Sequence, residues 1–105
     1  MDYVEIHWTC DSMEEAQMAA QALINEKLVA CANILPHMES VYVWEGAVER
    51  GKELKVFFKT LPELGEEVAL RIKELSSYDV PEISCVELKS LNADYLSWMR
   101  ESLSC

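Results

Sequence analysis

The chain has 105 residues, of which 50% are hydrophobic and 27% are charged, as expected for a single globular domain covering 1–105. Its 19 acidic residues outnumber its 9 basic ones, and the resulting formal charge of -10 would repel nucleic-acid phosphates, so we expect no nucleic-acid partner. The sequence has neither a basic, apolar leader nor a run of roughly 20 apolar residues, so we expect no signal peptide, no membrane partner and a cytoplasmic location.

A strand and a helix are the first predicted elements. Val4, Ile6 and Trp8 alternate with polar residues, which predicts a strand with one buried face. Ser12 and Glu15 have the spacing of a capping box, in which the serine caps a helix and the glutamate reaches back to the cap. Apolar residues then recur at helical spacing to about Lys27, at Ala16, Ala19, Ala20, Leu23 and Ile24.

A long β-hairpin is predicted next. Its first arm joins the apolar run 30–35 to an extended stretch over 40–45, and it bends where Pro36 cannot donate to the ladder. A turn over 46–51 leads to the second arm, 53–59. Taken as a whole over 30–59, the hairpin has about fifteen residues a side, which is longer than the usual strand of about 5 to 6 residues. We therefore expect the distal half to pair outside the small sheet, in a symmetric oligomer that closes its open edge.

The second half of the chain predicts two helices and one strand. Thr60 is expected to cap a helix with Pro62 in its first turn and Glu63 completing a capping box. That helix has a buried stripe formed by Leu64, Val68, Ile72 and Leu75. A loop over 76–81 precedes a strand over 83–88, and Asn92 is expected to cap a last helix. The resulting β-α-β-β-α-β order predicts an α+β, ferredoxin-like fold with an extra C-terminal helix.

The cysteines predict neither a disulfide framework nor a zinc site. Cys10, Cys31, Cys85 and Cys105 lie far apart, without a C-x-x-C pair, and should remain reduced thiols. Cys31 and Cys85 lie in apolar segments and are predicted to be small core residues.

Several motifs resemble those of the CutA family of divalent-cation tolerance proteins. The segment Ser40-Val41-Tyr42-Val43-Trp44-Glu45-Gly46 resembles the Y-x-W-x-G stretch of that family's long hairpin. Other matches follow in register, at 28–33 (the family's L-x-A-C-A-N turn), Glu53, 58–60, Tyr78-x-x-Pro81-Glu82 and 94–98. The resemblance covers essentially the whole chain. It implies a homotrimer related in fold to the PII signalling proteins, with paired hairpins and a cleft near each interface. It also implies a link to tolerance of divalent metals, chiefly copper.

The polar residues at matched positions are candidates for a ligand site in that cleft. Glu53, Lys59, Tyr78 and Glu82 are expected to lie near one end of the sheet, with Trp44, Tyr95 and Trp98 as apolar walls. A small-molecule pocket typically combines apolar or aromatic walls with a few polar groups. The alternative is a salt bridge between subunits from Lys59 to a glutamate, with the aromatic side chains filling the interface.

His7 and Cys10 are the candidates for metal coordination, because copper prefers imidazole and thiolate donors, with Asp11 as a hard third ligand. In a regular strand these two side chains would point to opposite faces. CutA relatives often carry histidine where this chain has Ser76 and Ser77. We therefore expect weak, salt-sensitive binding of copper or another divalent cation at most, and no required cofactor.

Three functional hypotheses follow. The leading one is a cytoplasmic, trimeric, CutA-like protein of the divalent-metal response that is not an enzyme, since no nucleophile, base and orienting group can be assembled from the spacing. The second is a PII-like sensor or scaffold that binds a small anion or a protein partner at the cleft between subunits. The third is an enzyme that uses Lys59 and Glu53 as an acid-base pair.

Overall fold

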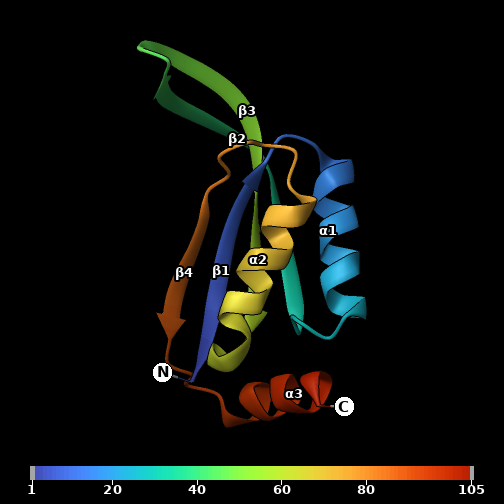
Figure 1. Ribbon diagram of the computed structural model, residues 1–105. Coiled ribbons are helices and arrows are strands. Elements are labelled where there is room, and N and C mark those ends of the chain that lie inside the picture. The colour runs from blue at the N-terminus through green and yellow to red at the C-terminus, as the bar shows by residue number, and fades with distance from the viewer. Residues whose placement is uncertain (1, 105) are drawn as a thin grey trace.

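The computed structural model describes residues 2–104, which form one four-stranded sheet and three α-helices (Figure 1). The elements are β1 (Tyr3–Cys10), α1 (Met13–Asn25), β2 (Cys31–Trp44), β3 (Ala47–Thr60), a 3-10 turn (Pro62–Leu64), α2 (Gly65–Leu75), β4 (Ile83–Leu88) and α3 (Ala93–Leu103). The strands lie in the order β2-β3-β1-β4, and all neighbours are antiparallel. The predicted β-α-β-β-α-β order and the extra C-terminal helix are confirmed.

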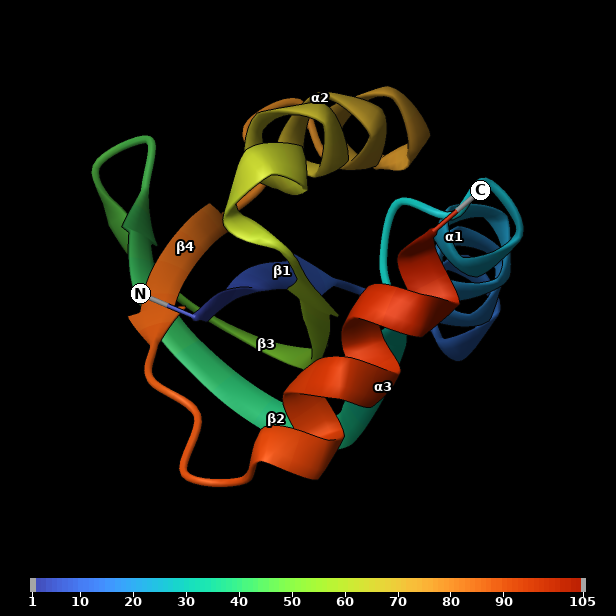
Figure 2. The ribbon, with the colours of Figure 1, turned by 90° about the horizontal axis from the view of Figure 1, so that it is seen from below.

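Helices α1 and α2 cover one face of the sheet, and the core lies between them (Figures 1 and 2). The alternation predicted for the first strand places Val4, Ile6 and Trp8 on that face, opposite buried residues of β3. The helices contribute Ala16, Ala19, Leu23, Val68 and Ile72, all of them buried. Burying one large apolar side chain contributes about 1.5–3 kcal/mol, so this layer stabilises the domain. The alternate residues of each strand face the opposite, open side of the sheet.

The last helix lies across one end of the sheet (Figure 2). Asn92 caps it, as predicted, by accepting hydrogen bonds from the backbone N–H groups of Asp94 and Tyr95. Met99 and Leu103 are its buried residues.

Among residues 2–104, no helix has both the length and the apolar character that crossing a bilayer requires.

The hairpin of β2 and β3 has 14 residues in each strand and projects beyond the rest of the sheet (Figure 1). The predicted bend is confirmed, because the ladder shifts register between Leu35 and Met38. His37, in this bulge, has a left-handed φ of 63°. The turn predicted over 46–51 is wrong. Only Glu45 and Gly46 form it, with φ values of 50° and 82° that suit a tight hairpin turn, and the ladder resumes at once.

The capping predictions are confirmed for Ser12 and wrong for Thr60. Ser12 Oγ accepts from the backbone N–H of Glu15 at 3.1 Å. The Glu15 carboxylate does not return to the cap; it accepts instead from the N–H and hydroxyl of Ser77, at 2.6 and 2.9 Å. Thr60 is the buried last residue of β3, and its hydroxyl donates to the Leu28 carbonyl at 2.6 Å. It is therefore not available to cap the helix that follows.

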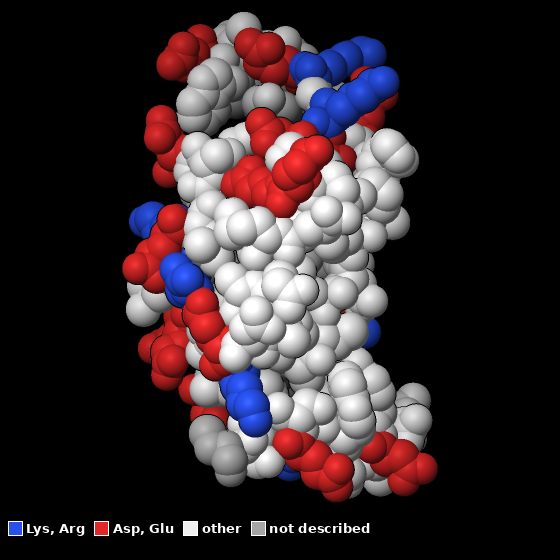
Figure 3. Space-filling view, turned by 90° about the vertical axis from the view of Figure 1, so that its right-hand side faces the viewer, with Lys and Arg blue, Asp and Glu red and all other residues white. Residues whose placement is uncertain are grey.

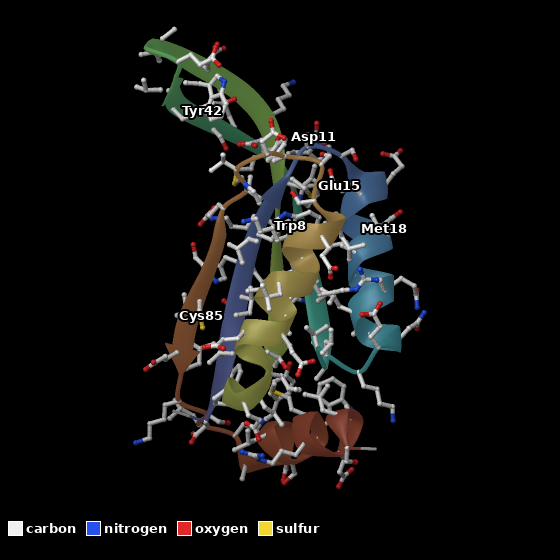
Figure 4. The ribbon with its side chains drawn as sticks, in the orientation of Figure 1. Trp8, Asp11, Glu15, Met18, Tyr42 and Cys85 are labelled. Atoms are coloured by element: carbon white, nitrogen blue, oxygen red, sulfur yellow. The ribbon has the colours of Figure 1, made fainter. Side chains whose placement is uncertain are left out.

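The three described cysteines are free thiols in different environments. Cys10 is buried, whereas Cys31 is half-buried and pairs with Lys59 in the ladder on the open face. Cys85 is exposed, because β4 is an edge strand that neither helix covers at this point (Figure 4). The prediction that Cys31 and Cys85 are core residues is wrong. Cys105 lies outside the described residues.

Candidate ligand-binding cleft

A cleft of about 580 Å³ lies on the open face of the sheet, beside the bend of the hairpin. Its walls are apolar and aromatic: Met38, Tyr42 and Trp44 come from β2, and Val80 comes from the loop between α2 and β4. Figure 4 labels Tyr42 on the projecting hairpin, above that loop. Small-molecule pockets have volumes of about 300–1,000 Å³. The cleft has the size and the wall composition of such a pocket.

Glu53 and Tyr78 form the first polar pair of the cleft. The Tyr78 hydroxyl donates to Glu53 Oε2 at 2.7 Å, which joins the loop to β3. Burial, followed by the hydrogen bond to Glu53 and the charge of that carboxylate, raises the pKa of Tyr78 well above its ordinary value. Because the phenol stays protonated at neutral pH, it remains a donor to the carboxylate.

Glu82 is the centre of a second polar group. Its carboxylate accepts hydrogen bonds from the hydroxyls of Thr9 and Ser84, at 2.8 and 3.0 Å, and lies 3.2 Å from Lys55 Nζ. Burial alone would raise the pKa of Glu82. The bonds from Thr9, Lys55 and Ser84 outweigh burial, so the pKa is lowered and the carboxylate stays charged.

Lys59 does not lie in the cleft. It is on the same face of β3 as Glu53, but six residues further along, about 20 Å at the usual strand rise. The acid-base pair of the enzyme hypothesis is therefore not assembled within one chain. Lys55, which sequence reasoning missed, is the lysine of the cleft. Lys55 could have been found from the sequence, because it lies two residues from Glu53 in a predicted strand and alternate residues of a strand share a face.

Tyr95 and Trp98 also lie elsewhere, on α3 at the other end of the sheet. Their rings are 5.4 Å apart, and Lys59 Nζ lies 5.7 Å from the Tyr95 centroid. The Tyr95 ring also meets Tyr3 edge to face at 6.3 Å. Burial, then the nearby Cys31 thiol, raises the pKa of Tyr95. Four of the seven predicted cleft residues line the cleft: Trp44, Glu53, Tyr78 and Glu82. The other three, Lys59, Tyr95 and Trp98, lie together at the other end of the sheet.

The structure does not bring the two metal-ligand candidates together. His7 faces the open side, where Nε2 lies 2.8 Å from Glu5 Oε1 and the ring stacks on Phe57 at 4.7 Å between centroids. Cys10 is buried on the helix-covered side, and this burial, with Glu15 nearby, raises the pKa of its thiol to about 11. Within residues 2–104, no three His, Cys, Asp or Glu side chains are grouped so that they could hold a metal ion. These residues do not fit a copper site.

The acidic residues are distributed over the surface. Figure 3, which shows the side of the molecule on which α1 lies, has acidic side chains near both ends and, interleaved with Lys and Arg, along one margin, with a broad uncharged area between the ends. A net negative surface attracts cations from a distance, and salt weakens that attraction.

Comparison with known proteins identifies one family. The family model described as "CutA1 divalent ion tolerance protein" matches residues 4–102. The chain is 41% identical over 96 residues to a divalent-cation tolerance protein CutA from Pyrococcus horikoshii, covering 91% of this chain and 93% of that protein. It is 36% identical to the chloroplastic protein CutA 1 of Oryza sativa, covering 94% of this chain and 56% of that protein. A solved structure of the periplasmic divalent cation tolerance protein CutA from Archaeoglobus fulgidus has a TM-score of 0.93 at 33% identity, covering 97% of this chain and 99% of that one.

Proposed function

The chain belongs to the CutA1 divalent ion tolerance family, and we propose that it contributes to the tolerance of divalent cations, copper among them, as a cytoplasmic homotrimer without catalytic activity. The observation that carries this proposal is the family match over residues 4–102. Deletion of the gene in its host should increase sensitivity to copper salts, and expression of this chain should restore tolerance. Unchanged sensitivity in the deletion strain would contradict the role in tolerance.

The proposed mode of metal interaction is diffuse attraction of cations. A tight site normally requires three or four well-placed donors, whereas His7 is engaged by Glu5 and the Cys10 thiol is buried and protonated. The formal charge of -10 remains as the source of attraction. Calorimetric titration with Cu²⁺ and with Zn²⁺ should give weak binding at low salt that fades at high salt. A salt-resistant Cu²⁺ complex with one ion per subunit would contradict this mode.

The proposed trimer is supported by the exposed apolar surface of the hairpin. Val41, Val43 and Val48 are 60%, 69% and 72% exposed, on a ribbon that no further strand of residues 2–104 flanks. Open strand edges of this length invite pairing with another chain, and closed symmetry limits that pairing to a defined oligomer. Light scattering at micromolar concentration should give three times the chain mass of 12.0 kDa. A monomer would contradict this part of the proposal.

A second candidate function is favoured by the cleft. Its volume of about 580 Å³, its aromatic walls and its polar pairs support a PII-like sensor that binds a small molecule. Only a ligand that prefers the native state raises its stability. A thermal-shift panel of metabolites and metal salts on one preparation therefore tests this candidate against the first. A rise in melting temperature with a metabolite would favour the sensor, and a rise with metal salts alone would favour the first candidate.

A further inference from the structure

The cleft carries more negative than positive charge. Three carboxylates line it, from Glu53, Asp79 and Glu82, against the single ammonium group of Lys55. The Lys55 charge is compensated, since Nζ lies 3.2 Å from Glu82 Oε1. An anionic ligand would therefore meet repulsion from the remaining carboxylates, and a cationic ligand would be attracted.

Glu53 is a half-buried carboxylate of the cleft that has room for a further partner, whereas Asp79 is exposed to solvent. Glu53 Oε2 accepts from Tyr78, and within residues 2–104 no hydrogen bond to Oε1 is present. An ionised carboxylate offers about four acceptor positions, so Oε1 can accept from a ligand N–H group. A hydrogen bond between an ammonium group and a carboxylate is roughly twice as strong as one between neutral groups.

The aromatic walls of the cleft complement a cation on an apolar body. Tyr42 and Trp44 lie on the same face of the hairpin as Glu53, and they remain 44% and 50% exposed. Rings of this kind attract a cation placed over their faces, and they bury apolar surface well. Met38 and Val80 extend the apolar wall.

We propose that this cleft binds an amphipathic organic cation, with a primary ammonium group on Glu53 and an apolar body against Tyr42 and Trp44. The inference rests on the second candidate function, the binding of a small molecule in the cleft. It replaces the small anion or protein partner expected from sequence with a small organic cation.

Four probes of related shape test the inference on the assembled protein. Phenethylammonium has both features of the proposed ligand, 2-phenylethanol lacks the charge, 3-phenylpropionate reverses it, and methylammonium lacks the ring. Calorimetric titration should rank phenethylammonium first, by roughly tenfold over the alcohol, the range of one charged hydrogen bond. Glu53→Gln should remove most of that advantage. Glu67→Gln, which removes an equal charge from the exposed first turn of α2, should change the affinity less than twofold.

Tyr78→Phe provides a second variant if Glu53→Gln fails to fold, as judged by circular dichroism. It leaves the Glu53 carboxylate in place and frees Oε2, so phenethylammonium should bind at least as tightly as to the unaltered protein. Equal affinity for the alcohol, or equal losses in Glu53→Gln and Glu67→Gln, would overturn the inference. Preferred binding of phenylpropionate would overturn it and leave the small-molecule candidate standing. Absence of binding by all four probes would count against both.

Discussion

The hydrogen bond from Tyr78 to Glu53 offers a quantitative test of the cleft. Tyr78→Phe removes one hydroxyl and leaves the ring, so the main loss is the 2.7 Å bond to the carboxylate. A hydrogen bond to a charged group contributes about 1.5–3 kcal/mol. Both side chains are only half-buried, so solvent replaces part of this energy. We expect the free energy of unfolding to fall by about 1–1.5 kcal/mol.

Urea unfolding at one fixed protein concentration measures this change, because assembly would couple stability to concentration. The m-value should stay constant, since the surface exposed on unfolding is unchanged. Tyr42→Phe is the matched control, on a cleft wall where no hydrogen bond from the tyrosine hydroxyl is present among residues 2–104, and it should lose less than about 0.5 kcal/mol. In an alkaline titration followed by absorbance, Tyr78→Phe should also remove a tyrosine ionisation that occurs above the ordinary range, because burial and Glu53 raise the pKa of Tyr78. Equal stability of the two variants, or loss of a tyrosine ionisation in the ordinary range from Tyr78→Phe, would refute the reasoning.

Four further outcomes are expected. Val43→Asp should shift the assembly toward monomer in light scattering while the far-ultraviolet circular dichroism of the domain persists, because Val43 is 69% exposed on the projecting hairpin; an intact trimer would count against the hairpin contact. Cys10 should react with iodoacetamide far more slowly than Cys85 at mildly alkaline pH, because it is buried and has a pKa of about 11; equal rates in peptide mass spectrometry would contradict this. The stability that Glu82 contributes should be complete above its ordinary pKa of 4.5 and should be lost as the pH falls through its lower folded-state pKa, so Glu82→Gln should flatten the acid limb of a stability-pH curve. His37→Gly should raise the free energy of unfolding by about 0.5 kcal/mol, because relief of the left-handed φ exceeds the entropic cost of glycine; a clear loss in the same urea assay would show that the imidazole makes a stabilising contact.

Local chemistry was sufficient to predict most of the fold. Alternation over Val4, Ile6 and Trp8 placed the first strand and its buried face, because the period of a strand is a property of neighbouring residues. Ser12 and Asn92 cap their helices as predicted, since each side chain reaches a backbone N–H within its own first turn.

The errors have non-local causes. Thr60 has the sequence context of a cap, but its hydroxyl binds the Leu28 carbonyl, which lies 32 residues away in the chain. Cys85 has apolar neighbours in sequence, yet its strand lies at the edge of the sheet. Whether Lys55 or Lys59 lines the cleft depends on which part of β3 lies beside the loop after α2. The alternation of a strand predicts only which face of the sheet each lysine occupies. Four residues of the cleft were therefore predictable from sequence, and the position of the cleft along the strand was not.

The bonds between Ser77 and Glu15 have a consequence for the cleft. Ser77 directly precedes Tyr78, and its N–H and hydroxyl both donate to one carboxylate on the first turn of α1. The Tyr78 N–H donates a third hydrogen bond, to Ser76 Oγ at 3.3 Å, within the loop. A loop fixed in this way has lost its conformational entropy during folding, so a ligand need not order it on arrival. The wall that carries Tyr78 and Val80 is preorganised, and the N-terminus of α1 maintains that geometry from outside the cleft.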